Sequence, residues 1–232
     1  MGPMILKIKT FIKEVGCYTK QFYEIIIGIA TLITSIATIL LMVNQNKLQE
    51  EANIINAATI SPCFHISQTR IDYDDNGIKD TEVLTVNNIG ANLKAPANIE
   101  ISVYYKVKKY APKTDITLTI PIAGYYYAQF STEQLYGELK SAYLLNNWSK
   151  YIDFEQAIHS YSKGDIFYFV SKVDVIKIEY IDTLGISHKS YYQNNSLITE
   201  EVYYKIKKDA TDTSYDVAKI DADEIIKLLD TI

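Results

Sequence analysis

The chain has 232 residues, of which 48% are hydrophobic and 22% are charged. This length suffices for one sizeable folded domain plus an appendage, and this composition excludes a wholly disordered chain. The net charge is −5, and Arg70 is the only arginine. These two facts exclude nucleic acid as the expected partner, because phosphate and base recognition depend on clustered basic side chains.

An apolar run without charges occupies residues 25–43, with the sequence IIIGIATLITSIATILLMV. As a helix this run spans roughly 28 Å, about the thickness of a bilayer's hydrocarbon core. A buried helix of a soluble protein and a cleaved signal peptide are the two alternatives. The run is longer than the apolar part of a signal peptide, and no small-residue cleavage site follows it. We therefore predict a transmembrane helix over residues 22–43, with the lipid bilayer as a partner.

The charges on the two sides of this run predict its orientation. The preceding segment contains Lys7, Lys9, Lys13 and Lys20, whereas the following segment is nearly neutral. This asymmetry places residues 1–21 in the cytoplasm as a basic tail and the C-terminal domain outside the cell membrane. Residues 44–57 have good helix formers and neither proline nor glycine, which predicts a helical stalk. Small residues such as Gly28 and Ser35 permit close helix packing, so a homo-oligomer is one candidate state.

Short alternating runs with turn signals between them follow the stalk. Clear cases are NIEISVYYKVKKY (98–110), TDITLTIPI (114–122) and DVIKIEYID (174–182). Such runs favour a mainly β, antiparallel sandwich over a parallel α/β sheet. We assign this sandwich to residues 58–206.

Two segments read as helices instead of strands. Residues 131–162 begin with Ser131 three before Gln134, a pattern typical of a capping box, and continue with apolar residues at helical spacing. We expect a small helical insertion there. Residues 207–232 are expected to form a C-terminal tail and helix, with acidic residues in the first turn. The heptapeptide VYYKVKK (103–109) returns as VYYKIKK (202–208), but the match ends there, so no duplicated domain is predicted.

Three stretches carry a resemblance to a known group of proteins. They are SPCFHI from Ser61, EVLTVNNIGANLKAPANIEI from Glu82 and IKIEYIDTLGISHKSYY from Ile176. Together with the apolar run, they make most of residues 25–193 similar to a loose group of bacterial single-pass membrane proteins of uncharacterised function. The resemblance implies an immunoglobulin-like β-sandwich preceded by one N-terminal transmembrane helix. It implies no activity.

Residues 72–80, DYDDNGIKD, match the front of a calcium-binding loop. The oxygen donors of such a loop at positions 1, 3, 5 and 9 would be Asp72, Asp74, Asn76 and Asp80. The twelfth position, which should supply a bidentate glutamate, is Val83. Asn-Gly is also a strong hairpin signal without any metal. We therefore expect a plain hairpin turn and keep a weak calcium site as the alternative; no other cofactor is expected.

The motifs that identify common enzymes are missing from the sequence. It has no phosphate loop, nucleophile elbow, CxxC or HExxH, so no catalytic residue is assigned. The favoured hypothesis is a membrane-anchored binding or assembly module, a subunit of a bacterial envelope complex with a protein partner. The alternative is a membrane-anchored enzyme of the metal-dependent hydrolase class. It requires Glu155, His159 and Asp165 to converge in a pocket near the helical insertion.

Overall fold

The computed structural model describes the backbone of residues 2–75 and 77–231, and the side chains of residues 22–52, 61–75 and 77–231. The chain divides into two compact units, Met1–Ala58 and Thr59–Ile232. Each unit is described by itself.

The first unit consists of one helix, α1 (Gly2–Ile60). Within the described residues it contains one stretch that is long and apolar enough to cross a membrane, Phe22–Ala52, whose most apolar 18 residues have a mean hydropathy of 2.5. The hydroxyls of Thr31, Thr34, Ser35 and Thr38 each donate to the carbonyl four residues earlier at 2.8 Å. These polar groups are therefore satisfied inside the helix, as a lipid environment requires. The helix also runs through residues 44–57, the segment expected to form a stalk; the side chains of the basic tail lie outside the described residues.

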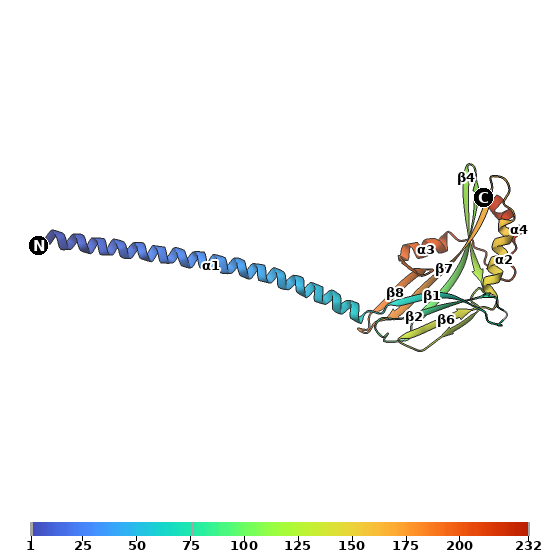
Figure 1. The fold of residues 1–232 in the computed structure, drawn as a ribbon, viewed down its shortest axis with the longest axis horizontal. Coiled ribbons are helices and arrows are strands. Elements are labelled where there is room, and N and C mark those ends of the chain that lie inside the picture. The colour runs from blue at the N-terminus through green and yellow to red at the C-terminus, as the bar shows by residue number, and fades with distance from the viewer. Residues whose placement is uncertain (1, 76, 232) are drawn as a thin grey trace. The chain divides into compact units, whose positions relative to one another are not determined.

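The second unit contains two β-sheets (Figure 1). The four-stranded sheet has the order β1 (Phe64–Ile71), β2 (Thr81–Asn88), β6 (Gly137–Tyr143) and β5 (Ala128–Ser131). The six-stranded sheet has the order β10 (Tyr215–Asp216), β4 (Thr114–Ala123), β3 (Asn98–Ala111), β7 (Phe167–Ile181), β8 (Ser187–Gln193) and β9 (Ser196–Ile198). Every strand pair in the described part of the chain is antiparallel except β10 with β4. The prediction of a mainly β domain is confirmed.

One hydrophobic core is shared by both sheets. Alternate residues of each strand point inward, as the period of two requires. A contact also joins the sheets directly, because the Lys140 ammonium on β6 donates to the Ile99 carbonyl on β3 at 2.7 Å. The fully buried core residues of β2, β3 and β7 are Leu84, Val86, Tyr105, Val107, Ile176 and Ile178.

The prediction of a helix is wrong for the first half of the insertion. Residues 137–143 form strand β6, which pairs with β2 on one side and β5 on the other. Ser131, the expected helix cap, lies in β5. Gly137 has φ +80°, a left-handed conformation that no α-helix contains. Because both edges of β6 receive ladder hydrogen bonds, strand pairing overrides the local helix propensity.

The second half of the insertion is helical. Helix α2 (Asn147–His159) connects β6 to β7 and buries Tyr151, Phe154 and Ile158 against the core. The sequence shows these three residues at helical spacing together with Tyr161, which lies beyond the end of α2. Helix α4 (Ala222–Asp230) begins after Asp221, whose side chain accepts from the Asp223 amide at 3.0 Å.

The C-terminal boundary of the sheet region differs from the predicted residue 206. Helix α3 (Glu200–Lys208) follows β9 directly, with Thr199 as its N-cap. Its first turn carries Glu200 and Glu201, and its last turn carries three lysines, so its charges complement the helix dipole. Strand β10 then returns to the six-stranded sheet within the segment expected to be a tail.

Candidate functional site

A charged cluster is buried between the two sheets. Lys172 and Asp174 lie on the inner face of β7, and Glu82 lies on the inner face of β2. The Lys172 ammonium is 2.7 Å from Glu82 Oε1 and also contacts Asp174 Oδ2. The three side chains are only 8%, 4% and 1% exposed, for Lys172, Glu82 and Asp174 respectively. One cation therefore serves two carboxylates that belong to different sheets.

Two neutral side chains complete this cluster. The Tyr126 hydroxyl donates to Glu82 Oε1 at 2.6 Å and accepts from the Lys172 ammonium at 3.2 Å. The Gln68 amide on β1 donates to Asp174 Oδ2. Burial raises the pKa of Tyr126 well above its usual value, so the phenol keeps its proton and remains a donor to Glu82.

The cluster forms one wall of a pocket of about 310 Å³, the inter-sheet pocket. Strand β8 pairs with β7 only from Val175 onward, so the preceding part of β7 has no strand on that side. Asn194 takes the next ladder position: its side-chain oxygen accepts from the Asp174 amide at 2.9 Å, and its own amide donates to the Asp174 carbonyl at 2.7 Å. The pocket is lined by Gln68, Arg70, Glu82, Trp148, Tyr151, Val170, Ser171, Lys172, Asp174 and Asn194.

Asp174 is the most unusual group in the inter-sheet pocket. Its residue is fully buried, and its Oδ1 atom has no hydrogen-bond partner. Burial raises the pKa of its carboxyl group, and the neighbouring Lys172 ammonium opposes that rise without cancelling it. Buried carboxyl oxygens nearly always have a partner. Asp174 Oδ1 is therefore the atom that a bound ligand is best placed to engage.

Arg70 and Trp148 form the other wall. The guanidinium carbon of Arg70 lies 3.5 Å from the centroid of the Trp148 ring, a close cation–π contact. Trp148 is fixed because its amide donates to the Asp80 carbonyl at 3.0 Å. The neighbouring Asn147 side chain also exchanges two hydrogen bonds with the Glu82 backbone, at 2.7 and 3.0 Å. The start of α2 is thus locked to the start of β2.

The predicted calcium ligands lie in the loop that joins β1 to β2. The Asp72 side chain accepts from the Gly77 amide at 2.6 Å, a bond that stabilises the turn. Asp80 is buried and accepts from the Thr81 hydroxyl at 3.0 Å, while Asn76 lies outside the described residues. Among the residues that are described, no three His, Cys, Asp or Glu side chains lie close enough together to hold a metal ion. The weak calcium site stays a prediction, which a calcium titration of the thermal unfolding midpoint would test.

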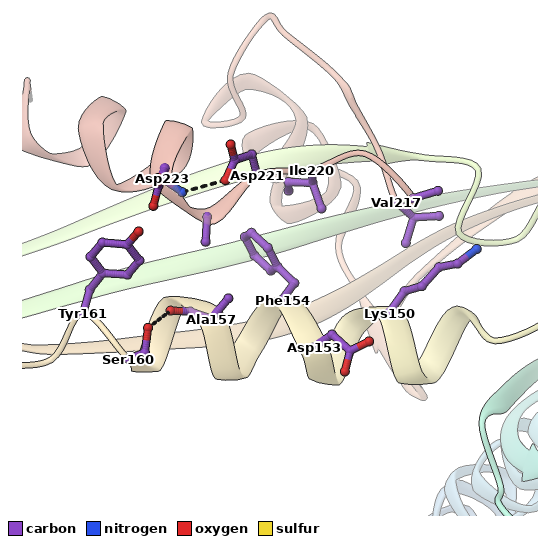
Figure 2. Close-up of a pocket in the computed structure, with 12 residues that line it drawn as sticks. Lys150, Asp153, Phe154, Ala157, Ser160, Tyr161, Val217, Ile220, Asp221 and Asp223 are labelled. Atoms are coloured by element: carbon purple, nitrogen blue, oxygen red, sulfur yellow. Dashed lines mark hydrogen bonds between the residues drawn. The ribbon is translucent and has the colours of Figure 1, made fainter.

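A second cavity, of about 510 Å³, lies between α2 and α4. Its lining includes the apolar side chains of Phe154 and Ile220, which Figure 2 shows between the two helices, and the acidic side chains of Asp153 on α2 and Asp221 before α4. Asp221 already caps α4, so one of these acidic side chains has a structural role. We rank this cavity below the inter-sheet pocket because no buried polar atom without a partner lines it.

The hydrolase alternative required three side chains to converge. Glu155 and His159 do line one apolar cavity, next to Phe169, but Asp165 is not among its lining residues. His159 Nδ1 lies 3.4 Å from the Tyr168 carbonyl. Two of the three required groups therefore share a cavity, and the third does not.

Sequence reasoning missed the inter-sheet pocket. Its signal was present, because Lys172 and Asp174 share the inner face of β7 with Ile176 and Ile178 in an otherwise apolar run. Charges on the buried face of a strand are expected to be paired or functional. The partner Glu82 comes from 90 residues earlier in the chain, which no local pattern reveals.

The comparisons with known proteins identify no family. No family model matches the chain, and no curated protein matches it. A solved structure described as that of an ApaA protein from Bordetella pertussis aligns over 57% of this chain and 93% of that chain, with 10% identity and a TM-score of 0.15. A score this low supports no argument about fold or function.

We predict that Lys172→Met destabilises the protein at neutral pH, because two buried carboxylates lose their cation. The expected loss in the free energy of unfolding is about 3–5 kcal/mol. It is measured by denaturing the detergent-solubilised full-length chain and following the fluorescence of Trp148, the only tryptophan.

Two variants serve as controls for this substitution. Lys177→Met removes a partly exposed ion pair with Glu179 on the same strand and should have a much smaller effect. Adding Glu82→Gln and Asp174→Asn to Lys172→Met should recover much of the loss. If Lys172→Met were no more harmful than Lys177→Met, the buried cluster would not exist as described.

Proposed function

We propose that the chain is a membrane-tethered binding module of the bacterial envelope, in which the inter-sheet pocket holds a small polar ligand. In this proposal α1 anchors the protein through Phe22–Ala52, and the β domain lies outside the cytoplasm as a subunit of an envelope complex. The lysine-rich segment before the apolar run supports this orientation.

The β domain is proposed to be an immunoglobulin-like sandwich. If β1 to β8 are named A to G in chain order, with β4 as C′, the four-stranded sheet has the order A-B-E-D. The six-stranded sheet has the order C′-C-F-G, with β10 beside C′ and β9 beside G. These orders match the arrangement of immunoglobulin domains, in which A, B, E and D form one sheet and C, F and G the other. Tyr105 on β3 supports the same assignment, because it is a fully buried aromatic residue on strand C.

One observation carries the binding proposal: Asp174 Oδ1 is buried, has no partner and belongs to a side chain that lines the pocket. An apolar residue of similar size would fill this place without the cost of burying a charge. A cavity of about 310 Å³ also lies at the lower end of the range for small-molecule sites. A binding role accounts for both features.

The binding proposal is tested with a library of small polar compounds and the full-length chain in detergent. We expect at least one compound to change Trp148 fluorescence and to raise the thermal midpoint, because a ligand that binds only the folded state stabilises it. Asp174→Asn should abolish both effects. Asp153→Asn, which changes the cavity of Figure 2, should leave them intact. If Asp153→Asn abolished the two effects and Asp174→Asn did not, the compound would bind in the cavity of Figure 2 and not in the inter-sheet pocket.

The orientation is tested by cysteine labelling of intact cells. In a background with Cys17→Ser and Cys63→Ser, Asn195→Cys places a thiol in the exposed turn between β8 and β9. A membrane-impermeant reagent should label it without permeabilisation, whereas Thr10→Cys in the basic tail should need permeabilisation. The reverse pattern would overturn the proposed topology.

A further inference from the structure

We propose that the inter-sheet pocket binds a small zwitterion of the amino-acid class, with its ammonium group at Asp174 and its carboxylate at Arg70. This inference rests on the proposed binding function and names the ligand of that same pocket.

The ammonium end follows from Asp174. Its Oδ2 atom already accepts from the Lys172 ammonium and the Gln68 amide, so that oxygen is occupied. The other oxygen, Oδ1, is buried without a partner in a side chain that lines the pocket. A ligand ammonium group carries up to three donors and a charge opposite to that of the carboxylate. An ammonium group therefore supplies both the missing hydrogen-bond donor and the opposite charge that the buried Oδ1 atom lacks.

The carboxylate end follows from Arg70. Glu82 stands directly opposite Arg70 in the β1–β2 ladder, yet Glu82 forms its ion pair with Lys172. Among the ion pairs of the described residues, none includes Arg70. Its guanidinium group is stacked on Trp148 instead. Stacking uses the face of the guanidinium plane and leaves its N–H edge for a bidentate carboxylate.

The spacing of these two groups suits a short ligand. Arg70 is two residues from Gln68 on the same side of β1, where it is exposed, and Gln68 donates a hydrogen bond to Asp174. Alternate residues of a strand are about 6.8 Å apart. A molecule with its ammonium and carboxylate on one carbon, or separated by a short spacer, spans such a distance when both ends are hydrogen-bonded. The pocket volume of about 310 Å³ accommodates a ligand of this size.

The charges of the pocket discriminate against singly charged ligands. A simple anion that reaches Arg70 is close to the carboxylates of Glu82 and Asp174, and a simple cation at Asp174 is close to Lys172 and Arg70. A zwitterion presents the complementary charge to both ends. Burial raises the pKa of the Asp174 carboxyl group, and an arriving ammonium group opposes that rise by favouring the ionised form.

The test uses the full-length chain in detergent, with Trp148 fluorescence as the readout. The common L-amino acids are added as one mixture and then singly. Each amino acid that binds is compared with its analogue without the amino group and its analogue without the carboxylate; for L-alanine these are propionate and ethylamine. We expect at least one amino acid to bind and both of its analogues to bind at least tenfold more weakly.

Two variants assign the two ends. Arg70→Gln should weaken amino-acid binding but not the binding of the amine analogue, which the Arg70 charge repels. Asp174→Asn should weaken the amino acid and the amine but not the carboxylate analogue. Equal binding of an amino acid and either analogue would overturn the inference. The inference would also be overturned if the amino-acid mixture had no effect while another library compound bound at Asp174. That result would still support the proposed function. If no compound of any class binds, both proposals fail.

Discussion

The ion pairs of Lys172 with Glu82 and Asp174 are the interactions on which the candidate site depends. The Lys172–Glu82 pair joins β7 of one sheet to β2 of the other, and Lys172 also pairs with Asp174 on its own strand, inside a largely apolar core. Replacing a buried ion pair by apolar residues of the same volume is often neutral or stabilising, so stability alone does not explain such a cluster. A role in binding explains it better, because the cluster presents Asp174 to a pocket while its remaining groups are hydrogen-bonded.

Each wall of the pocket is set by a different feature of the chain. The end of β8 at Gln193 leaves the edge of β7 uncovered before Val175, and Asn194 closes the ladder at that point. The helix between β6 and β7 brings Trp148 against Arg70. Hydrogen bonds from the start of α2 to the start of β2 hold this arrangement in place. An insertion in the connection between two strands has thus produced the aromatic wall of the site.

The sequence predicted the features that depend on local patterns. The apolar run, the alternating strands and the spacing of Tyr151, Phe154 and Ile158 on α2 each have a period that single segments display. Residues 137–143 were misassigned because their helix propensity is overridden by pairing with two strands. The heptapeptides make the same point: VYYKVKK is part of β3 between two partners, whereas VYYKIKK lies in α3 after a threonine cap and two acids. The site itself combines Gln68, Glu82, Trp148 and Asp174 from distant segments, and only the fold brings them together.

The pH dependence of stability tests the central claim most directly. Burial raises the pKa of Asp174 in the folded protein, so the folded chain holds this proton at pH values where the unfolded chain has released it. The resulting stabilisation is complete below the ordinary pKa of aspartate, about 3.9, and is lost as the pH rises through the raised value. The measurement is the free energy of unfolding of the full-length wild type minus that of Asp174→Asn, at pH values from about 3 upward. The account predicts that this difference falls from about pH 4 and levels off above the raised pKa; a difference that stays constant or rises with pH would contradict it.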